Sequence, residues 1–201
     1  MTTIPATHKG KSVVAVASRA DWREWLTAHH AQPDGVWVAY PKQGTGAGVR
    51  YVELVEESLC FGWIDSLPNK LSATHTLLYI APRKPRSRWS AVNKAMVERL
   101  VAAGRMHPAG LAKVALAKQT GTWSALDEVS ALIVPDDLRA ALAGDPAAER
   151  FFAAFPASTR RGILEWILDA RTPATREKRI RETVRLAALD VRANTPAAKG
   201  R

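Results

Sequence analysis

The sequence predicts an α+β fold, with a small, mainly antiparallel sheet and helices in the N-terminal part and an α-helical C-terminal part. Three observations indicate this class. Apolar runs rich in β-branched and aromatic residues, which are typical of strands, occur up to Ile80. From Pro135 onward the apolar residues instead recur every third or fourth position, as in amphipathic helices. The length of 201 residues, 47% of them hydrophobic, suffices for one domain with an appended subdomain.

Helices and strands alternate in the predicted N-terminal part. Ser18 is a helix N-cap residue with Asp21 three positions later, where an acid favours the first helical turn. Gly62 follows an apolar helical stripe and is placed to end that helix in the left-handed conformation. The expected elements are a helix over 19–30, a strand over 36–40, a flexible loop over 44–48, a helix over 52–59, and strands over 63–67 and 74–80 joined through Pro68-Asn69.

Start and stop signals also place the later helices. Ser90 caps a helix that ends at Gly104, and Pro108 starts another that ends at Gly121. The signals that follow are helix starts at Pro135-Asp136-Asp137, Asp145-Pro146 and Ser158, and one weak strand signal over 131–134.

The change of pattern near Gly121 predicts two parts. We expect an α+β domain over 12–121, which carries an Arg- and Trp-rich loop, and a helical C-terminal subdomain over 122–192. Residues 1–11 and 193–201 are expected to be disordered tails. Whether the two parts fold independently is left open by the sequence.

The charge of the chain is strongly basic and unevenly placed. Lys and Arg number 29 against 19 Asp and Glu, which gives a net charge of +10. Between Lys70 and Arg105 there are eight Lys or Arg and a single acid, Glu98. Such clustering favours anionic partners, among them nucleic acid. A general use of Arg throughout an Ala-rich sequence is the alternative explanation.

Three features bear on the compartment of the protein. Cys60 is the single cysteine, so an internal disulfide is excluded and nothing supports an oxidising compartment. No apolar run approaches the roughly 18 residues that a membrane-spanning helix needs. Lys9 and Lys11 precede an apolar segment shorter than the roughly 7–15 residues of a signal-peptide core. We therefore expect a cytoplasmic protein.

The densest basic stretch, Pro82 to Ser90, is a candidate anion site. Pro82 and Pro85 stiffen the backbone, so the loop can hold guanidinium groups at set positions. Arg prefers planar partners such as phosphate and carboxylate, and the helix start at Ser90 also favours anions. The candidate ligand-binding residues are Arg83, Arg86, Arg88, Trp89, Ser90, Asn93, Arg105 and Asp65. The alternatives are a solvated loop that Trp89 anchors to the core, and an Asp65 carboxylate that only fixes one arginine.

Few residues suggest catalysis or a cofactor. Cys60 ends a predicted helix, where the helix dipole disfavours a thiolate, so we expect it in the core rather than paired with His75 as a nucleophile. The histidines show no metal-ligand spacing. Gly44-x-Gly46-x-Gly48 is not followed by a helix start, so it is no dinucleotide fingerprint. We predict no metal and no cofactor.

Several motifs carry a family resemblance. They are Trp22-x-x-Trp25-Leu26, Ser58-Leu59-Cys60-Phe61-Gly62-Trp63-Ile64-Asp65, Pro82-Arg83-x-Pro85-Arg86-Ser87-x-Trp89-Ser90-x-x-Asn93, Gly104-Arg105-Met106-x-Pro108-x-Gly110 and Ala170-Arg171-x-x-x-x-Arg176-x-x-Arg179-Ile180. Over roughly residues 21–189 the chain resembles the YdeI/OmpD-associated family, also labelled bacteriocin-protection. The resemblance implies a link to bacteriocin or antimicrobial-peptide tolerance and supplies no catalytic residue.

The sequence is compatible with three functions. The first is a non-enzymatic cytoplasmic protein of this family that binds a small anionic ligand through the Arg-rich loop. The second is a nucleic-acid-binding protein that uses the same loop and the basic last helix, although no nucleic-acid-binding motif is present. The third is an enzyme of unknown reaction on an anionic substrate, for which no complete set of nucleophile and base is visible. The oligomeric state is left open.

Overall fold

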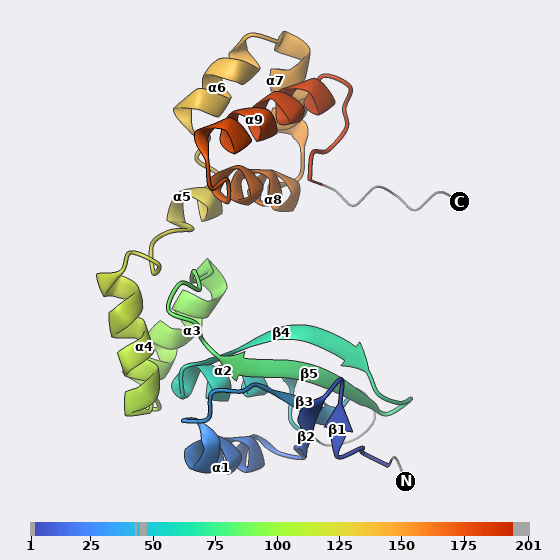
Figure 1. The fold of residues 1–201 in the computed structure, drawn as a ribbon, viewed down its shortest axis with the longest axis vertical. Helices are drawn as coiled ribbons and strands as arrows, with labels where there is room; N and C mark the ends of the chain where they lie inside the picture. Colours follow the sequence, from blue (N-terminus) through green and yellow to red (C-terminus); the bar gives the residue numbers. More distant parts are fainter. Residues whose placement is uncertain (1–2, 43, 45–47, 195–201) are drawn as a thin grey trace. The chain divides into compact units, whose positions relative to one another are not determined.

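The chain divides into two compact units, Met1–Ser124 and Ala125–Arg201, called unit 1 and unit 2 below. The computed structural model describes residues 3–42, 44 and 48–194. Unit 1 contains a five-stranded sheet and the first helices, whereas the described part of unit 2 contains helices alone (Figure 1). The predicted α+β class is therefore confirmed.

The sheet of unit 1 is mixed and mainly antiparallel. Its strands are β1 (Thr7–His8), β2 (Lys11–Ala15), β3 (Val36–Pro41), β4 (Trp63–Lys70) and β5 (His75–Pro82), in the order β1-β2-β3-β5-β4. The pair β2 and β3 is parallel, and helix α1 (Arg19–His29) forms the crossover between them. The other three pairs are antiparallel, so the sheet is mainly antiparallel, as predicted.

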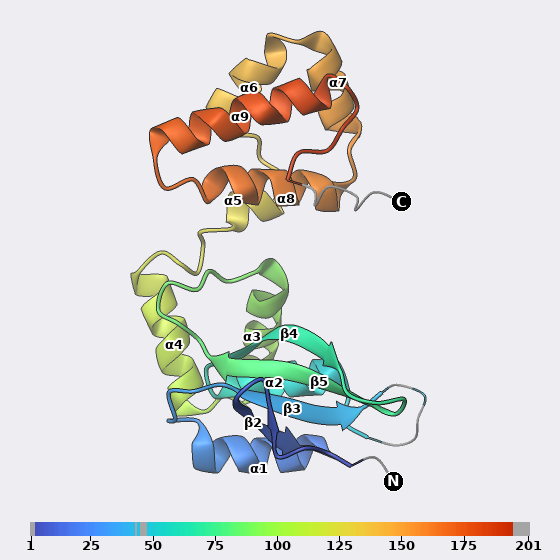
Figure 2. The same ribbon diagram turned by 45° about the vertical axis from the view of Figure 1, so that its right-hand side comes forward.

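Helices cover one face of this sheet. Helix α1 and helix α2 (Tyr51–Cys60) lie against the same side (Figure 2). Side chains alternate across a strand, so Val36 and Val38 of β3 join the main core with these helices. Trp37 and Ala39, one position out of phase, form a smaller cluster on the other face. The alternation in the sequence thus decides which residues meet α1 and α2.

Two predictions for the sheet are wrong. Pro68 and Asn69 do not form a turn but lie inside β4, whose register shifts between Asp65 and Pro68. Because β4 is an edge strand, a proline and a bulge can be placed there without losing a central hydrogen bond. Residues 3–11, predicted to be disordered, include β1, which pairs with β2. The predicted loop over 44–48 lies largely outside the described residues.

The predicted helix signals of unit 1 are confirmed. Ser18 and Asp21 form a full capping box at the start of α1. Ser90 accepts a hydrogen bond from the amide of Asn93 and so caps α3 (Ala91–Ala102). Helix α4 (Pro108–Gln119) begins at the predicted proline. Gly62, Gly104 and Gly121, each placed after a helix, have positive φ angles.

Over residues 125–194, the described part of unit 2, five helices pack around an apolar core. They are α5 (Asp127–Ser130), α6 (Asp136–Ala143), α7 (Pro146–Ala154), α8 (Ala157–Leu168) and α9 (Pro173–Ala187). Leu138, Phe152 and Ile167 are buried in that core. Asp145 caps α7 by accepting hydrogen bonds from two amides of its first turn. Ser158 lies one residue inside α8 instead of capping it.

Two sequence predictions for unit 2, a weak strand and a disordered C-terminal tail, differ from the structure. The weak strand signal over 131–134 produces no strand, because no neighbouring strand is available among the described residues of unit 2. Ala193, placed in the predicted C-terminal tail, is buried, and residues 195–201 lie outside the described part. No helix in the described ranges is long and apolar enough to cross a membrane.

Candidate anion-binding site

The predicted site residues lie in two different places within unit 1. Most of them belong to the loop between β5 and α3, which carries Arg83, Trp89 and Ser90. Arg105 follows α3 and forms an ion pair with Glu57 of α2. The predicted set therefore divides into a loop and a second cluster, and each has its own chemistry.

Arg83 is the buried centre of the loop. Only 4% of its surface is exposed, and its guanidinium lies 3.7 Å from the centroid of the Trp89 ring. Its Nη2 donates a hydrogen bond of 2.8 Å to the carbonyl oxygen of Arg88. Burial lowers the pKa of Arg83 to about 10, although the nearby charge of Asp65 acts in the opposite direction. Arg83 and Trp89 together hold the loop against the core.

The other predicted site residues have local partners or face solvent, and two of them, Asp65 on β4 and Asn93 in α3, lie outside the loop itself. Asp65 accepts a 2.6 Å hydrogen bond from the hydroxyl of Tyr51, and it forms no ion pair with an arginine in the described residues. The alternative in which Asp65 bridges one arginine is therefore wrong. Ser90 caps α3 through the amide of Asn93. Arg86 is exposed at the surface of the loop. Ligand contact by this loop stays a prediction.

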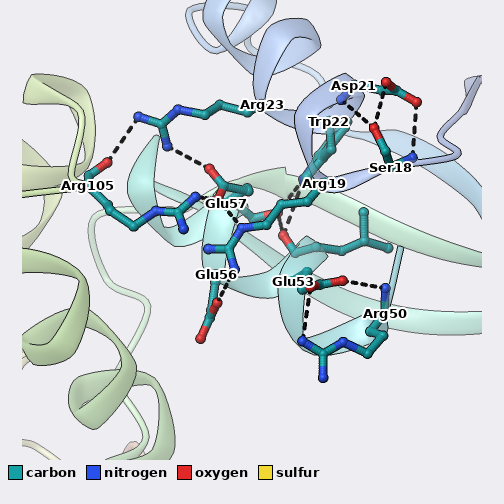
Figure 3. A network of polar contacts seen from close by, with 12 residues as sticks. Ser18, Arg19, Asp21, Trp22, Arg23, Arg50, Glu53, Glu56, Glu57 and Arg105 are labelled. Carbon is teal, nitrogen blue, oxygen red and sulfur yellow. Dashed lines mark hydrogen bonds and ion pairs between the residues drawn. The ribbon is translucent and has the colours of Figure 1, made fainter. Parts of the chain in front are cut away.

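The second cluster is built around the carboxylate of Glu57, which is fully buried (Figure 3). Oε1 of Glu57 is 2.5 Å from Nε of Arg19, and Oε2 is 2.6 Å from Nη1 of Arg23. Nη2 of Arg105 also pairs with Oε1. One carboxylate thus binds three guanidinium groups, which come from α1 and from the segment after α3.

A second glutamate, Glu56, lies beside Glu57, but the two carboxylates do not balance the positive charge of the surrounding arginines. Oε2 of Glu56 is 2.9 Å from Nη1 of Arg19, and Oε1 is 3.6 Å from Nη2 of Arg99. With these residues the cluster contains four arginines and two glutamates. We call this set, Arg19, Arg23, Glu56, Glu57, Arg99 and Arg105, the arginine cluster. It has an excess of two positive charges.

The positive charge of the arginine cluster is accessible to solvent. The side chains of Arg23 and Arg105 are 38% and 39% exposed, while that of Glu57 is completely covered. Nη2 of Arg23 also donates to the carbonyl oxygen of Arg105, at 3.1 Å, which links α1 to the segment after α3. The hydrogen bond to Glu57 raises the pKa of Arg23. The guanidinium groups are therefore fixed in place and stay charged.

Sequence reasoning found only one residue of this cluster, Arg105. Glu57 and its partners on α1 were missed, because they are far apart in the sequence and meet only in the folded chain. One signal was available, since Arg19 and Arg23 are spaced four residues apart and must share one face of a helix. The matching acid on α2 has no sequence signal of its own.

Cys60 lies one turn after Glu57 and is fully buried, which confirms its predicted place in the core. Burial and the charge of Glu57 raise the pKa of its thiol, against the opposite effect of Arg23 and Arg105. A thiol in this state is a poor nucleophile at neutral pH. Within the described ranges there is also no group of three or more His, Cys, Asp or Glu that could hold a metal ion.

A histidine pair borders the arginine cluster. His107 caps α4, because its Nδ1 accepts a hydrogen bond from the amide of Ala109 at 3.2 Å. Its ring centroid lies 4.7 Å from that of Phe61 and 4.7 Å from that of His30. Burial, His30 and Arg23 lower the pKa of His107. The folded chain therefore favours neutral His107.

This lowered pKa predicts a loss of stability in acid. As the pH falls below about 6.5, the unfolded chain takes up a proton at His107 before the folded chain does, so the free energy of unfolding decreases. The decrease continues until the pH passes the lower pKa of the folded state. His107→Asn should keep a cap acceptor and remove this part of the pH dependence. Urea unfolding of both proteins across this range measures it, and identical slopes would contradict the prediction.

The fold and the arginine cluster define a basic α+β protein with two units, the first organised around a buried carboxylate bound by arginines. Comparison with known families gives two matches. Residues 131–189 match the family described as "Bacteriocin-protection, YdeI or OmpD-Associated", which confirms the predicted resemblance for unit 2. Residues 14–113 match a domain of unknown function (DUF8412). No curated protein and no solved structure matches the chain.

The two matches divide the motifs on which the resemblance was based. The motif from Ala170 to Ile180 lies within the bacteriocin-protection match. The motifs from Trp22 to Gly110 lie within the domain of unknown function. The arginine cluster belongs to this second region, so neither family description assigns it a role.

Proposed function

We propose that this chain is a non-enzymatic cytoplasmic protein that binds a phosphate- or carboxylate-bearing ligand at the arginine cluster and serves bacteriocin or antimicrobial-peptide tolerance. The tolerance role rests on the family description matched by unit 2. The binding role rests on one observation in unit 1, the sharing of a single buried carboxylate by three arginines.

The charge of the arginine cluster supports anion binding. Each guanidinium has five N–H donors, and Glu57 cannot accept hydrogen bonds from all of those on its three partners. An anion at the exposed edges of Arg23 and Arg105 would reduce the positive excess and accept hydrogen bonds from both. Phosphate and carboxylate have the planar or multi-oxygen geometry that guanidinium groups prefer.

The ion pairs with Glu57 also prepare the site for a ligand. An unrestrained arginine loses side-chain entropy when a ligand fixes it, at a cost of about 0.5–1.5 kcal/mol. Here the hydrogen bonds of Arg23 to Glu57 and to the carbonyl oxygen of Arg105 already fix that side chain. Binding at this site therefore needs little further ordering.

The charge of unit 1 also limits the kind of ligand. The unit contains sixteen Lys or Arg and eight Asp or Glu, a net charge of +8. Such a surface repels cationic peptides, so direct sequestration of a cationic antimicrobial peptide is disfavoured. The proposed contribution to tolerance therefore runs through an anionic ligand rather than through the peptide itself.

One observation favours single-stranded nucleic acid as a second candidate ligand. The ring of Trp123 is half-buried, with Nζ of Lys118 at 5.3 Å and Nζ of Lys94 at 5.8 Å from its centroid. Trp123 also packs against Trp89, at 5.0 Å between centroids. An aromatic ring bordered by cations is the arrangement on which bases stack.

Isothermal titration calorimetry tests the proposed site with pyrophosphate, citrate and a single-stranded oligonucleotide as probes. Arg23→Ala and Arg105→Ala should each weaken pyrophosphate or citrate binding by about one to two decades, because each lost charge-assisted hydrogen bond is worth roughly 1.5–3 kcal/mol. Arg50→Ala is the control, since Arg50 precedes α2, is exposed, and forms an ion pair only with Glu53 in the described residues. It should bind like the wild type.

The same titrations separate the two candidate functions. Binding at the arginine cluster should persist at moderate salt, whereas binding along a phosphate backbone falls steeply with salt concentration. Loss of oligonucleotide binding in Trp123→Ala, with pyrophosphate binding intact, would favour the second function. No binding of any probe, or equal losses in Arg50→Ala and Arg23→Ala, would contradict the proposed site. Arg23→Lys keeps the positive charge but loses the planar, bidentate donors of the guanidinium. It should also weaken anion binding, which separates loss of binding from loss of folding.

A further inference from the structure

A groove in unit 2 has the character of a binding surface and takes no part in the proposed anion site. It lies between α6 and α9 and has a volume of about 640 Å³. Its lining residues are Ala141, Lys178, Arg181, Glu182, Val184 and Arg185. All except Ala141 belong to α9, so one helix supplies most of the surface that a ligand would contact.

The walls of the groove are fixed. Arg176 of α9 pairs with Asp137 of α6 through two hydrogen bonds, of 2.6 Å from Nε and 2.9 Å from Nη2. Below the surface, Leu138 and Leu142 of α6 and Ile180 of α9 belong to one buried cluster. The two helices are therefore held together by an ion pair and by core packing. A ligand would meet a groove that is already formed.

The lining has apolar residues and a row of cations. Ala141 and Val184 are partly buried against the core of unit 2 and provide the apolar part. Lys178, Arg181 and Arg185 follow one another at intervals of three and four residues, so they lie along one face of α9. From Lys178 to Arg185, seven residues further on, the row extends about 10.5 Å, or two helical turns.

Acidic neighbours neutralise only part of this row. Arg185 is paired with Glu182 through two hydrogen bonds, and Arg181 is paired with Glu177. Lys178 forms no ion pair with a carboxylate in the part of the chain that the structure describes, although its charge helps to lower the pKa of Glu182. These pairs are exposed, and exposed ion pairs contribute little and exchange readily with other carboxylates. The row can therefore accept carboxylates from a partner.

We propose that this groove binds an acidic amphipathic helix of a partner protein. The apolar side of that helix would lie on Ala141 and Val184. Its carboxylates, spaced three and four residues apart, would face the row of Lys178, Arg181 and Arg185. The two-turn row of cations matches the periodicity of a helix better than that of a single small anion. The interaction does not depend on the arginine cluster of unit 1.

Fluorescence polarisation with the full chain tests this inference. The probe is a fluorescein-labelled helical peptide with Glu at positions i, i+3 and i+7 and Leu on the adjoining face. We expect saturable binding, and at least tenfold weaker binding for Lys178→Glu and for Arg181→Glu. Arg139→Glu is the matched control, because Arg139 is an exposed arginine of α6 that does not line the groove. It should retain the affinity of the wild type.

Two further measurements decide the specificity. A scrambled peptide of the same composition, and one with Ser in place of Leu, should each bind at least tenfold more weakly. Arg23→Ala should bind the helical peptide normally, so a failure of the anion site leaves this result unaffected. No peptide binding by the wild type, equal binding of the scrambled peptide, or an equal loss in Arg139→Glu would overturn the inference.

Discussion

Replacement of Glu57 by Gln is expected to lower the free energy of unfolding of unit 1 by about 3–5 kcal/mol, the usual cost of removing one partner from a buried ion pair. The neutral amide keeps the size of the side chain but cannot balance the guanidinium groups of Arg19, Arg23 and Arg105. Those three groups connect α1, α2 and the segment after α3. Their mutual repulsion would then oppose the packing of these elements.

Denaturant unfolding followed by tryptophan fluorescence measures this effect, because six of the seven tryptophans belong to unit 1. The control is Glu53→Gln, which lies on the same helix and pairs only with Arg50, three residues away, among the described residues. That change should cost less than about 1 kcal/mol, because Arg50 is exposed and glutamine keeps an acceptor for the amide of Arg50 at the helix start. A similar small loss for Glu57→Gln would show that the buried carboxylate does not hold the cluster together.

Replacement of Gly110 by Ala is expected to cost about 3 kcal/mol or more, at the upper end of what overpacking causes. A Cβ atom at Gly110 would lie 2.1 Å from the carbonyl oxygen of Cys60 and 2.8 Å from that of Leu59. Both are backbone atoms of α2, so no side-chain rotation relieves the contact. Helix α4 would have to move away from α2.

Differential scanning calorimetry of Gly110→Ala and of a control glycine checks this prediction. Gly162 in α8 is the control, since an added Cβ there would meet nothing within 4 Å. Gly162→Ala should be neutral or stabilising by up to about 1 kcal/mol, the difference in helix propensity. An equally small effect at Gly110 would mean that the close approach of α2 and α4 does not constrain the fold.

Local signals predicted most of the fold. Ser18, Ser90 and Asp145 cap helices as their sequence positions indicate, because capping depends on a few adjacent residues. The edge strand β4 was misjudged at Pro68, because edge position depends on strand order, which local sequence does not carry. The pairing of residues near the N-terminus with β2 was missed for the same reason.

The site was only partly predictable because its chemistry depends on long-range partners. Arg83 and Arg105 are equally basic in sequence, yet one is buried against Trp89 and the other is 39% exposed beside Glu57. The cluster of Lys and Arg residues in the sequence predicted an anion-binding surface in unit 1, but it could not show which of these residues form that surface. The deciding residue, Glu57, is one of several acids on α2, and only its contact with Arg19 and Arg23 distinguishes it.

The central claim, anion binding at the arginine cluster, is tested most directly by NMR of the arginine Nε–Hε groups during titration with pyrophosphate. The proposed site predicts that the resonances of Arg23 and Arg105 shift and saturate together, while that of Arg50 stays in place. Shifts of all arginines in proportion to the added pyrophosphate, without saturation, would contradict the claim. So would saturating shifts confined to Arg83, Arg86 and Arg88 of the loop.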